Sequence, residues 1–287
     1  MRDCDIFSYT AADLALMPRR PADSNKGTFG RVLCVCGSRE MAGAAFLAAK
    51  AALRTGAGLA EILTPEENRV ALQILLPEAI VTPYDSSTPD TAVIESALSR
   101  ADTVVCGCGL GTSRGAQRVL SFVLRNVHVP LVLDADALNL ISQSPALLKY
   151  ARGAIITPHP GEMARLTGLS TDEINTDRET VCRDLARKHS LVCVLKGKDT
   201  VVSDGSRAYI NTSGNSGMAT AGSGDVLAGI VGGVLAQNRR ESKLSALEVA
   251  ALAVYIHGLC GDAAAESLGE YSVIASDIIE ALPKVLR

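Results

Sequence analysis

The sequence predicts an α/β fold, in which a mostly parallel central sheet carries helices on both faces. Short apolar runs rich in Val, Ile and Leu alternate with longer segments of helical periodicity along most of the 287 residues. Hydrophobic residues make up 47% of the chain, yet aromatic residues make up only 3% and Trp is absent. Small and branched aliphatic residues must therefore build the core, which suits strands buried on both faces. No linker, repeat or low-complexity stretch divides residues 1–287, so we expect one domain.

The strands are predicted where short apolar runs end at Gly, Pro or Asp. The run at 31–37 ends at a glycine, and a helix over 42–58 follows it. Further strands are expected at 59–65, 78–84, 102–109, 130–136, 153–160 and 191–197. Helical stretches at 91–100, 114–126 and 178–190 lie between several of them. Asp204-Gly205 predicts a hairpin within 200–211, and the chain from Gly224 onward is predicted to be mainly helical.

Net charge and hydropathy indicate which kinds of partner and which location in the cell to expect. The net charge of −3 gives no electrostatic reason to expect binding to nucleic acid or to a membrane surface. No uninterrupted apolar segment is long enough for a transmembrane helix. The first twenty residues lack the apolar core and cleavage site of a signal peptide. We therefore expect a cytoplasmic protein.

The cysteines are predicted to be small buried hydrophobes that stay reduced. A zinc ribbon would need C-x2-C pairs bounded by turns, whereas the closely spaced cysteines here form C-x-C pairs inside strand-like runs. We also expect the two thiols of each pair to lie on opposite faces of the sheet. The eight residues are Cys4, Cys34, Cys36, Cys106, Cys108, Cys182, Cys193 and Cys260.

Polar residues whose side chains could take part in catalysis or ligand binding cluster at the carboxyl ends of the predicted strands. Open parallel sheets bind ligands beyond these ends, so we expect one binding rim. Asp134 is expected to face a phosphate or a metal, whereas Asp136 and Asn139 could cap the following helix. The glycines at strand end 107–111 either permit close approach of a ligand or form a tight turn. The rim comprises Gly37-Ser38, Gly107 to Gly111, Asp134 to Asp136, Thr157 to Glu162 and Lys196 to Asp199.

The segment NTSGNSGMATAGSGDVLAG (211–229) places a single acid where a glycine-rich loop becomes a helix. It matches neither the Walker A loop nor the dinucleotide-binding fingerprint. Gly222 and Gly224 let backbone amides converge on an anion, and the helix N-terminus adds partial positive charge. Asp225 could then take a proton from a hydroxyl that attacks a phosphate. The alternative is an ordinary first-turn acid that contributes about 0.3–1 kcal/mol; the other rim residues favour the catalytic interpretation.

Two other strand ends carry titratable residues. In TPHPGE (157–162) flanking prolines hold His159 at the rim, although a lone histidine in a loop is often only a surface residue. Glu162 either holds a hydrated Mg2+ through water or is a plain first-turn acid. In KGKDT (196–200) Lys196 and Lys198 lie beside the flexible Gly197 and suit nucleotide phosphates or a ribose. The alternative there is a solvated turn between a strand and a hairpin.

Taken together and in this order, these segments resemble the ribokinase-like superfamily, and within it the ATP- or ADP-dependent NAD(P)H-hydrate dehydratases. The resemblance runs from about Asn25 to the C-terminus. GMATAGSGDVL combined with TPHPGEMARL is highly specific, whereas many sugar and vitamin kinases share only the final G-x-G-D. The other matching pieces are KGTFGRVLCVCGS, GAAFLAAKAALRTGAGL, GCGLGT, LDADALNL and VLKGKDTVV. The resemblance implies a ribokinase-like three-layer sandwich without a lid domain.

The resemblance also implies roles for residues at matching positions. The hydrate pocket would be lined by Gly43, Ala44, Gly109, Gly111, His159 and Asp225. The adenine nucleotide would be bound by Lys196, Gly197, Lys198, Asp199, Thr200 and Gly224. Relatives commonly form homotetramers and use Mg2+. The chain departs from the family pattern at Met41 and Ala45, where an aromatic residue and a proline are usual, and at Asn25, where His is common.

The implied activity is that of a metabolite-repair lyase. It would return the S epimer of NADH hydrate or NADPH hydrate to NAD(P)H, with ADP or ATP as phosphoryl donor. Bacterial members are usually described as ADP-dependent, so we expect ADP. Phosphorylation turns the ring hydroxyl into a good leaving group. Asp225 would take the hydroxyl proton while the amides of Ala221, Gly222, Ser223 and Gly224 stabilise the transferring phosphate. About thirty residues precede the first predicted strand, too few for the epimerase domain of many relatives, so we expect a separate epimerase.

Two alternatives remain, one an enzyme of the same fold and one from another class of protein. A small-molecule kinase of the same fold, acting on hydroxyethylthiazole or a pyridoxal-type alcohol, would release a phosphorylated product. TPHPGE together with KGKDT argues against it. A catalytically silent nucleotide-binding protein would need no base, and the intact GSGD argues against that.

Overall fold

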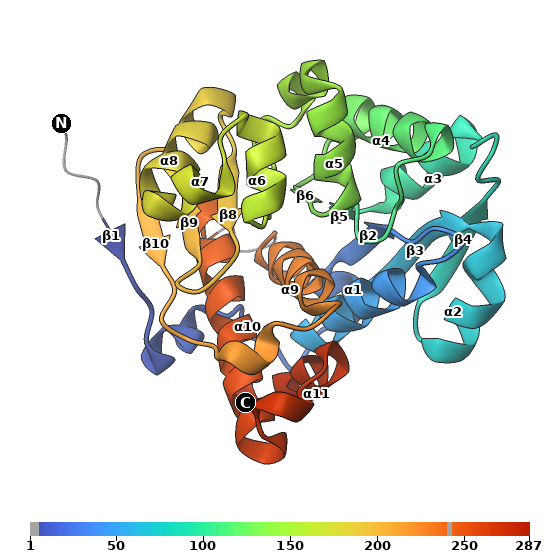
Figure 1. The fold of residues 1–287 in the computed structure, drawn as a ribbon. Coiled ribbons are helices and arrows are strands. Elements are labelled where there is room, and N and C mark those ends of the chain that lie inside the picture. Colours follow the sequence, from blue (N-terminus) through green and yellow to red (C-terminus); the bar gives the residue numbers. More distant parts are fainter. Residues whose placement is uncertain (1–5, 240–242) are drawn as a thin grey trace.

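The computed structural model describes residues 6–239 and 243–287 and confirms the predicted α/β architecture (Figure 1). Within these ranges ten strands form one sheet in the order β1-β10-β9-β8-β7-β6-β5-β2-β3-β4. Strand β9 is antiparallel to both of its neighbours, and every other neighbouring pair is parallel.

Strands β2, β5, β6, β7 and β8 end earlier than predicted, because the predicted runs included the polar rim, whereas β3 and β4 end where predicted. Strand β1 is an addition that the sequence analysis did not predict. The strands are β1 (Ile6–Phe7), β2 (Arg31–Val35), β3 (Leu59–Pro65), β4 (Ile80–Tyr84), β5 (Thr103–Cys106), β6 (Leu131–Leu133), β7 (Ile155–Ile156), β8 (Val192–Leu195), β9 (Val201–Ser203) and β10 (Ala208–Ile210). The pairing of β9 with β10 confirms the predicted hairpin.

Helices cover both faces of the sheet, as predicted (Figure 1). The helices are α1 (Ala42–Thr55), α2 (Arg69–Leu75), α3 (Thr91–Arg100), α4 (Arg114–Asn126), α5 (Asp136–Gln143), α6 (Pro160–Thr167), α7 (Thr171–Thr176), α8 (Arg178–His189), α9 (Ser223–Asn238), α10 (Ala246–Leu268) and α11 (Ala275–Val285). One apolar cluster joins α1, α2, α9, α10 and α11 to the sheet, and a second joins α3 to α8 to its other face. Successive strand residues belong alternately to the two clusters: Val32 lies in the first and Leu33 in the second.

Helix α9 packs unusually close to its neighbours because glycines replace side chains on its inner surface. A Cβ atom on Gly229 would lie 2.2 Å from the Ala48 carbonyl oxygen of α1. A Cβ atom on Gly232 would lie 2.5 Å from Cγ2 of Val105 on β5. The close packing seats the N-terminus of α9 beside the carboxyl ends of the strands.

Contrary to the expectation from sequence, helix α10 is long and apolar enough, by length and composition, to cross a membrane, but 72% of its most apolar window is buried inside the protein. Its apolar residues belong to the same core cluster as those of α9. The apolar residues of α10 are therefore explained by packing in the core of the protein beside α9.

The seven cysteines within the described residues are free and buried, as predicted, while Cys4 lies outside them. The expectation that paired thiols lie on opposite faces is wrong for Cys34 and Cys36, which pack in the same core cluster. Residues two apart on a strand share a face. Cys106 and Cys108 do lie in different clusters, because the chain turns at Gly107 with a φ of 124°.

All strands except β9 run in the same direction, so their carboxyl ends lie along one edge of the sheet. The reversed strand β9 carries the chain away from this edge, and β10 brings it back. As a result, the loop after β8 and the loop after β10 open on the same edge. This topology gathers the rim segments that the sequence analysis singled out.

Candidate active site

A largely buried lysine and two buried carboxylates form the centre of the rim. Nζ of Lys196, directly after β8, lies 2.6 Å from Oδ1 of Asp134 and 3.8 Å from Oε2 of Glu162. The Thr157 hydroxyl donates to the same Asp134 oxygen at 2.7 Å. Burial alone would lower the pKa of Lys196, but the attraction of Asp134 and Glu162 outweighs it and raises that pKa. The lysine is therefore charged, as a buried ion needs a partner of opposite charge.

Asp225 lies in the first turn of α9 and faces this cluster. One ligand atom each from Asp225, Asp134 and Cys108 lie within 4.8 Å of one another. Burial, followed by the negative charge of Asp134, raises the pKa of Asp225 to about 7, although a hydrogen bond with Cys108 and the charge of Lys196 oppose the rise. The sequence predicts Asp225 as the base but gives no sign of this raised pKa. A base with a pKa near the working pH is better suited to proton transfer.

The start of α9 presents free backbone donors beside Asp225. Gly222 caps the helix in the left-handed conformation, with a φ of 87°. Among the described residues, the amides of Ala221, Gly222 and Gly224 donate no hydrogen bond, while that of Ser223 donates to the Thr220 carbonyl oxygen at 3.3 Å. Free first-turn amides form an anion site. The geometry is compatible with the predicted phosphate cradle, with Ser223 as its least available amide.

His159 and Glu162 cap helix α6 reciprocally. Nδ1 of His159 accepts from the amides of Gly161 at 3.0 Å and Glu162 at 3.3 Å, and Oε2 of Glu162 accepts from the His159 amide at 2.8 Å. Burial and the nearby charges of Lys196 and Arg165 lower the pKa of His159. A neutral ring that accepts at Nδ1 carries its proton on Nε2. The half-exposed ring of His159 can therefore donate from Nε2 into the rim.

Glu162 is predicted to hold hydrated Mg2+ through water. Burial raises its pKa, and Lys196 opposes this only in part. One of its oxygens accepts from the His159 amide at 2.8 Å, and the other lies 3.4 Å from Nε2 of the same residue. Mg2+ takes oxygen ligands and usually keeps several waters. A carboxylate whose oxygens already have neighbours fits an ion held through water better than one coordinated directly.

The glycine loop after β5 packs on the start of α1. A Cβ atom on Gly109 would lie 2.7 Å from Cβ of Ala44, so these two predicted pocket residues are in close contact. Nothing lies within 4 Å of a Cβ atom built on Gly43, which is exposed beside them. The Gly111 amide donates to Oδ2 of Asp136 at 2.8 Å. Asp136 thus holds the glycine loop in place.

The KGKDT loop folds back on itself. The Thr200 hydroxyl donates to the Gly197 carbonyl oxygen at 2.9 Å, and Asp199 adopts a φ of 53°. Lys196 points inward to Asp134, whereas Lys198 and Asp199 are exposed. Lys196 therefore joins the cluster and Thr200 is buried within the turn. Gly197, Lys198 and Asp199 are exposed, where a nucleotide could contact them.

The sequence predicts no functional role for three residues near the cluster, although two of them lie within the predicted rim. Cys108, whose Sγ lies 3.7 Å from Oδ2 of Asp134, was interpreted only as a core residue. His257 lies on α10 with Nε2 3.3 Å from the Ser223 hydroxyl, and a lone histidine on an apolar helix gives no sequence signal. Ala135, between two rim acids, adopts φ 47° and ψ −116°, a strained conformation for a residue with a side chain.

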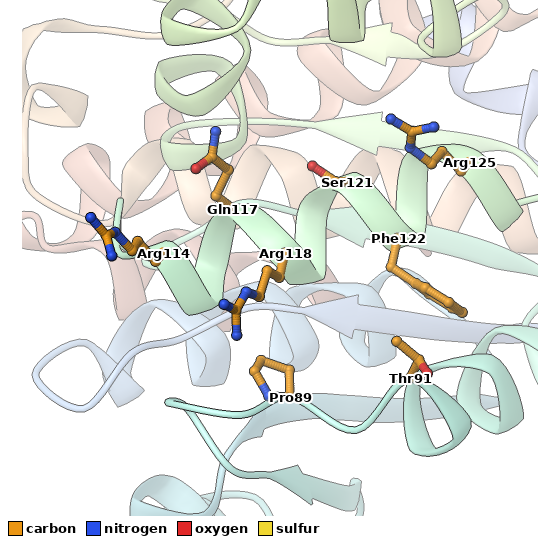
Figure 2. A pocket seen from close by; sticks show the side chains of 8 residues that line it. All are labelled: Pro89, Thr91, Arg114, Gln117, Arg118, Ser121, Phe122 and Arg125. Atoms are coloured by element: carbon orange, nitrogen blue, oxygen red, sulfur yellow. The ribbon is translucent and has the colours of Figure 1, made fainter.

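A groove of about 530 Å³ lies along α4 (Figure 2). It is lined by Pro89, Thr91, Arg114, Gln117, Arg118, Ser121, Phe122 and Arg125. None of the predicted site residues is among them. We assign the active site to the rim instead, because the rim holds the paired buried charges, the free amides and the carboxylate with a raised pKa.

Comparisons with known proteins show the family to which the chain is similar. Residues 32–284 match the family model described as NAD(P)H-hydrate dehydratase. The ADP-dependent (S)-NAD(P)H-hydrate dehydratase of Neisseria meningitidis is 40% identical over 87% of this chain and 82% of its own length. The bifunctional NAD(P)H-hydrate repair enzyme of Coxiella burnetii is 41% identical over 92% of this chain and 51% of its own. The chain thus spans about half the length of the bifunctional relatives it matches.

Solved structures show the same fold. A ribokinase-like superfamily protein of Enterococcus faecalis superposes with a TM-score of 0.86 at 32% identity, covering 98% of this chain and 95% of the other. The ADP/ATP-dependent NAD(P)H-hydrate dehydratase of Bacillus subtilis, co-crystallised with ATP/Mg2+, gives a TM-score of 0.81 at 27% identity over 99% and 98% of the two chains. With its ribokinase-like fold and a family match over most of its length, this chain belongs to the NAD(P)H-hydrate dehydratase family.

Proposed function

We propose that this protein dehydrates the S epimer of NADH hydrate or NADPH hydrate to NAD(P)H, with ADP or ATP as phosphoryl donor. The observation that carries the proposal is Asp225, a carboxylate with a pKa raised to about 7 beside the free amides at the start of α9. This pairing suits transfer of a phosphoryl group to a hydroxyl. The names of two relatives, both NAD(P)H-hydrate dehydratases, support the hydroxyl of NAD(P)H hydrate as the acceptor.

The reaction has two parts. In the first, the ring hydroxyl forms a bond to the terminal phosphorus of the nucleotide, the bridging phosphorus–oxygen bond breaks, and Asp225 accepts the hydroxyl proton. In the second, the lone pair of the ring nitrogen expels phosphate, the carbon–oxygen bond breaks, and loss of a proton from the adjacent ring carbon restores the double bond. The nucleotide leaves with one phosphate fewer, and inorganic phosphate balances the reaction.

The protein contributes mainly position and charge. The amides of Gly222 and Gly224 can donate to the transferring phosphoryl oxygens, and the Lys196 ammonium lies next to them: its Nζ is 3.3 Å from where a Cβ atom on Gly224 would be. Preorganised donors of this kind stabilise charge that develops in the transition state. Glu162 would hold Mg2+ through water, and bound Mg2+ would supply further positive charge beside the nucleotide phosphates.

The decisive assay incubates the protein with NADH hydrate, Mg2+ and either ADP or ATP. Return of the absorbance of reduced nicotinamide, with one phosphate released per ring restored, supports the dehydratase. A stable phosphorylated product from a small alcohol, without ring restoration, would instead identify a kinase. Inactivity with every substrate combined with tight nucleotide binding would identify a silent binding protein. Comparing ADP with ATP and NADH hydrate with NADPH hydrate in the same assay fixes both preferences.

We also propose a cytoplasmic homotetramer that depends on Mg2+ and works with an NAD(P)H-hydrate epimerase activity. Family resemblance supports the tetramer, and the bifunctional names of several relatives support a coupled second activity. Sedimentation at micromolar concentration tests the assembly, since a monomer there contradicts it. Chelation followed by Mg2+ readdition tests the metal. Addition of an epimerase should let the protein consume the R epimer as well.

A further inference from the structure

Helix α10 fastens the loop that leads into the phosphate cradle. Both carboxylate oxygens of Asp262 are used: one accepts from the Gly214 amide and the other from the Asn215 side chain, each at 2.9 Å. The Ser213 hydroxyl donates to the Tyr255 carbonyl oxygen at 3.0 Å. The loop between β10 and α9 thus takes its course from α10.

Glycines on α10 let this loop lie directly on the helix. A Cβ atom on Gly258 would come within 2.1 Å of the Ser213 hydroxyl oxygen. One on Gly261 would come within 2.2 Å of the sulfur of Met218. The contacts leave little freedom in how the loop approaches α9, so α10 acts as a rigid support for the cradle.

His257 makes the contact closest to the chemistry. It precedes Gly258, and its Nε2 lies 3.3 Å from the hydroxyl oxygen of Ser223, the first residue of α9. Burial, with the charge of Lys196 adding to it, lowers the pKa of His257 to about 4, although a hydrogen bond with the Ser223 backbone opposes the shift. The ring is therefore neutral at physiological pH. Its contact with Ser223 does not switch on or off between about pH 6 and 9.

We propose that His257 is a positioning residue for phosphoryl transfer, which orients the Ser223 hydroxyl and with it the first turn of α9. The inference rests on the proposed function. His257 acts through Ser223 and not on the reacting atoms. Misplacing cradle donors by a fraction of an ångström weakens contacts made in the transition state more than contacts made in the ground state. The effect should therefore fall on kcat and not on the KM for nucleotide.

The test is a double-mutant cycle between His257 and Ser223. We expect His257→Ala to lower kcat about 10-fold, with the nucleotide KM changed less than about 3-fold. His257→Gln should recover much of this loss, because the Gln side-chain amide can occupy the position of Nε2. Ser223→Ala should also lower kcat, and the double Ala variant should be little worse than either single variant. His128→Gln, on an exposed residue after α4, is the matched control and should leave kcat unchanged.

Multiplicative losses in the double variant, or a higher KM at unchanged kcat, would overturn the proposal. A spectroscopic measurement separates this result from failure of the proposed function. In protein labelled with 15N-histidine, Ser223→Ala should move the ring-nitrogen resonances of His257 whether or not the wild type dehydrates NADH hydrate. An unmoved spectrum rejects the contact itself. A moved spectrum in a protein without dehydratase activity rejects only the proposed function.

Discussion

At the level of single residues, one lysine interacts electrostatically with three carboxylates. Lys196 pairs with Asp134 at 2.6 Å and lies 3.8 Å from Glu162, and its charge also lowers the pKa of Asp225. One positive charge cannot neutralise all three carboxylates. Burial and the negative charge of Asp134 outweigh the effect of Lys196 on Asp225, whose pKa is raised to about 7.

Replacing Asp225 with Asn tests the base directly. The amide keeps the size of the side chain but cannot accept the hydroxyl proton, so we expect kcat to fall by at least about 100-fold. Nucleotide affinity, measured by calorimetry, should stay within a few-fold of wild type. Near-normal turnover in Asp225→Asn would remove Asp225 from the mechanism.

The pH profile should report the same carboxylate. Asp225 must be deprotonated to act as a base, and its pKa is raised to about 7. The rate constant kcat/KM should therefore be constant well above pH 7 and fall as the pH drops through 7. Lys196→Gln removes a charge that lowers this pKa, so its profile should shift to higher pH. A wild-type profile that is flat from pH 5 to 8 would show that another group limits the rate.

At the level of elements, the ends of neighbouring strands fix the site by backbone contact. A Cβ atom on Gly107, at the end of β5, would lie 1.9 Å from the carbonyl oxygen of Asp134, at the end of β6. The close approach sets where the Asp134 carboxylate stands relative to Lys196. The next residue, Ala135, carries the strained backbone of this turn.

Gly107→Ala should be strongly destabilising, because neither backbone can yield without moving the strand ends. We expect the free energy of unfolding to drop by more than about 3 kcal/mol, measured by urea denaturation. Gly153→Ala is the matched control: Gly153 also has a positive φ of 78°, but nothing lies within 4 Å of its added Cβ. Its loss should be about 1–2 kcal/mol, from backbone strain alone. Equal losses in the two variants would show that the contact with Asp134 is unimportant.

Ala135→Gly should instead raise the free energy of unfolding. Relief of a strained φ and ψ is favourable by about 1–3 kcal/mol, while the added freedom of glycine in the unfolded chain costs about 0.5–1 kcal/mol. The difference predicts a gain of about 1 kcal/mol in the free energy of unfolding. Urea denaturation of the two proteins side by side measures it, and a loss of stability would show that the methyl group of Ala135 matters more than its backbone.

At the level of the whole molecule, the order of elements was predictable and the contacts between them were not. Buried parallel strands leave long aliphatic runs, so the interior strands were found from sequence. Strand β1 is only Ile6–Phe7, too short for any periodicity, and exists through pairing with β10. The rim was predicted because strand ends can be read locally. The contacts of Cys108 with Asp134 and of His257 with Ser223 depend on how separate elements pack.

Ligand binding should stabilise the folded protein as a whole. At a nucleotide concentration 100 times Kd, the free energy of unfolding should rise by about 2.7 kcal/mol. For a domain of this size that corresponds to a rise in Tm of about 5–10 °C. Thermal melts with ADP and Mg2+ should show this rise in wild type and in Asp225→Asn alike. Absence of the rise at saturating ADP and ATP would contradict nucleotide binding at the rim.

The reversed strand β9 also sets a length. It separates β8 from β10, so the loop at Lys196 and the loop at Asn211 begin two interstrand spacings apart, about 10 Å. Backbone hydrogen bonds fix this separation, and no side-chain substitution can change it. The spacing of the strands therefore fixes the distance between the two loops that border the site. Related proteins could acquire a different substrate through changes in the side chains of the two loops. The distance between the loops that a ligand must span would stay the same.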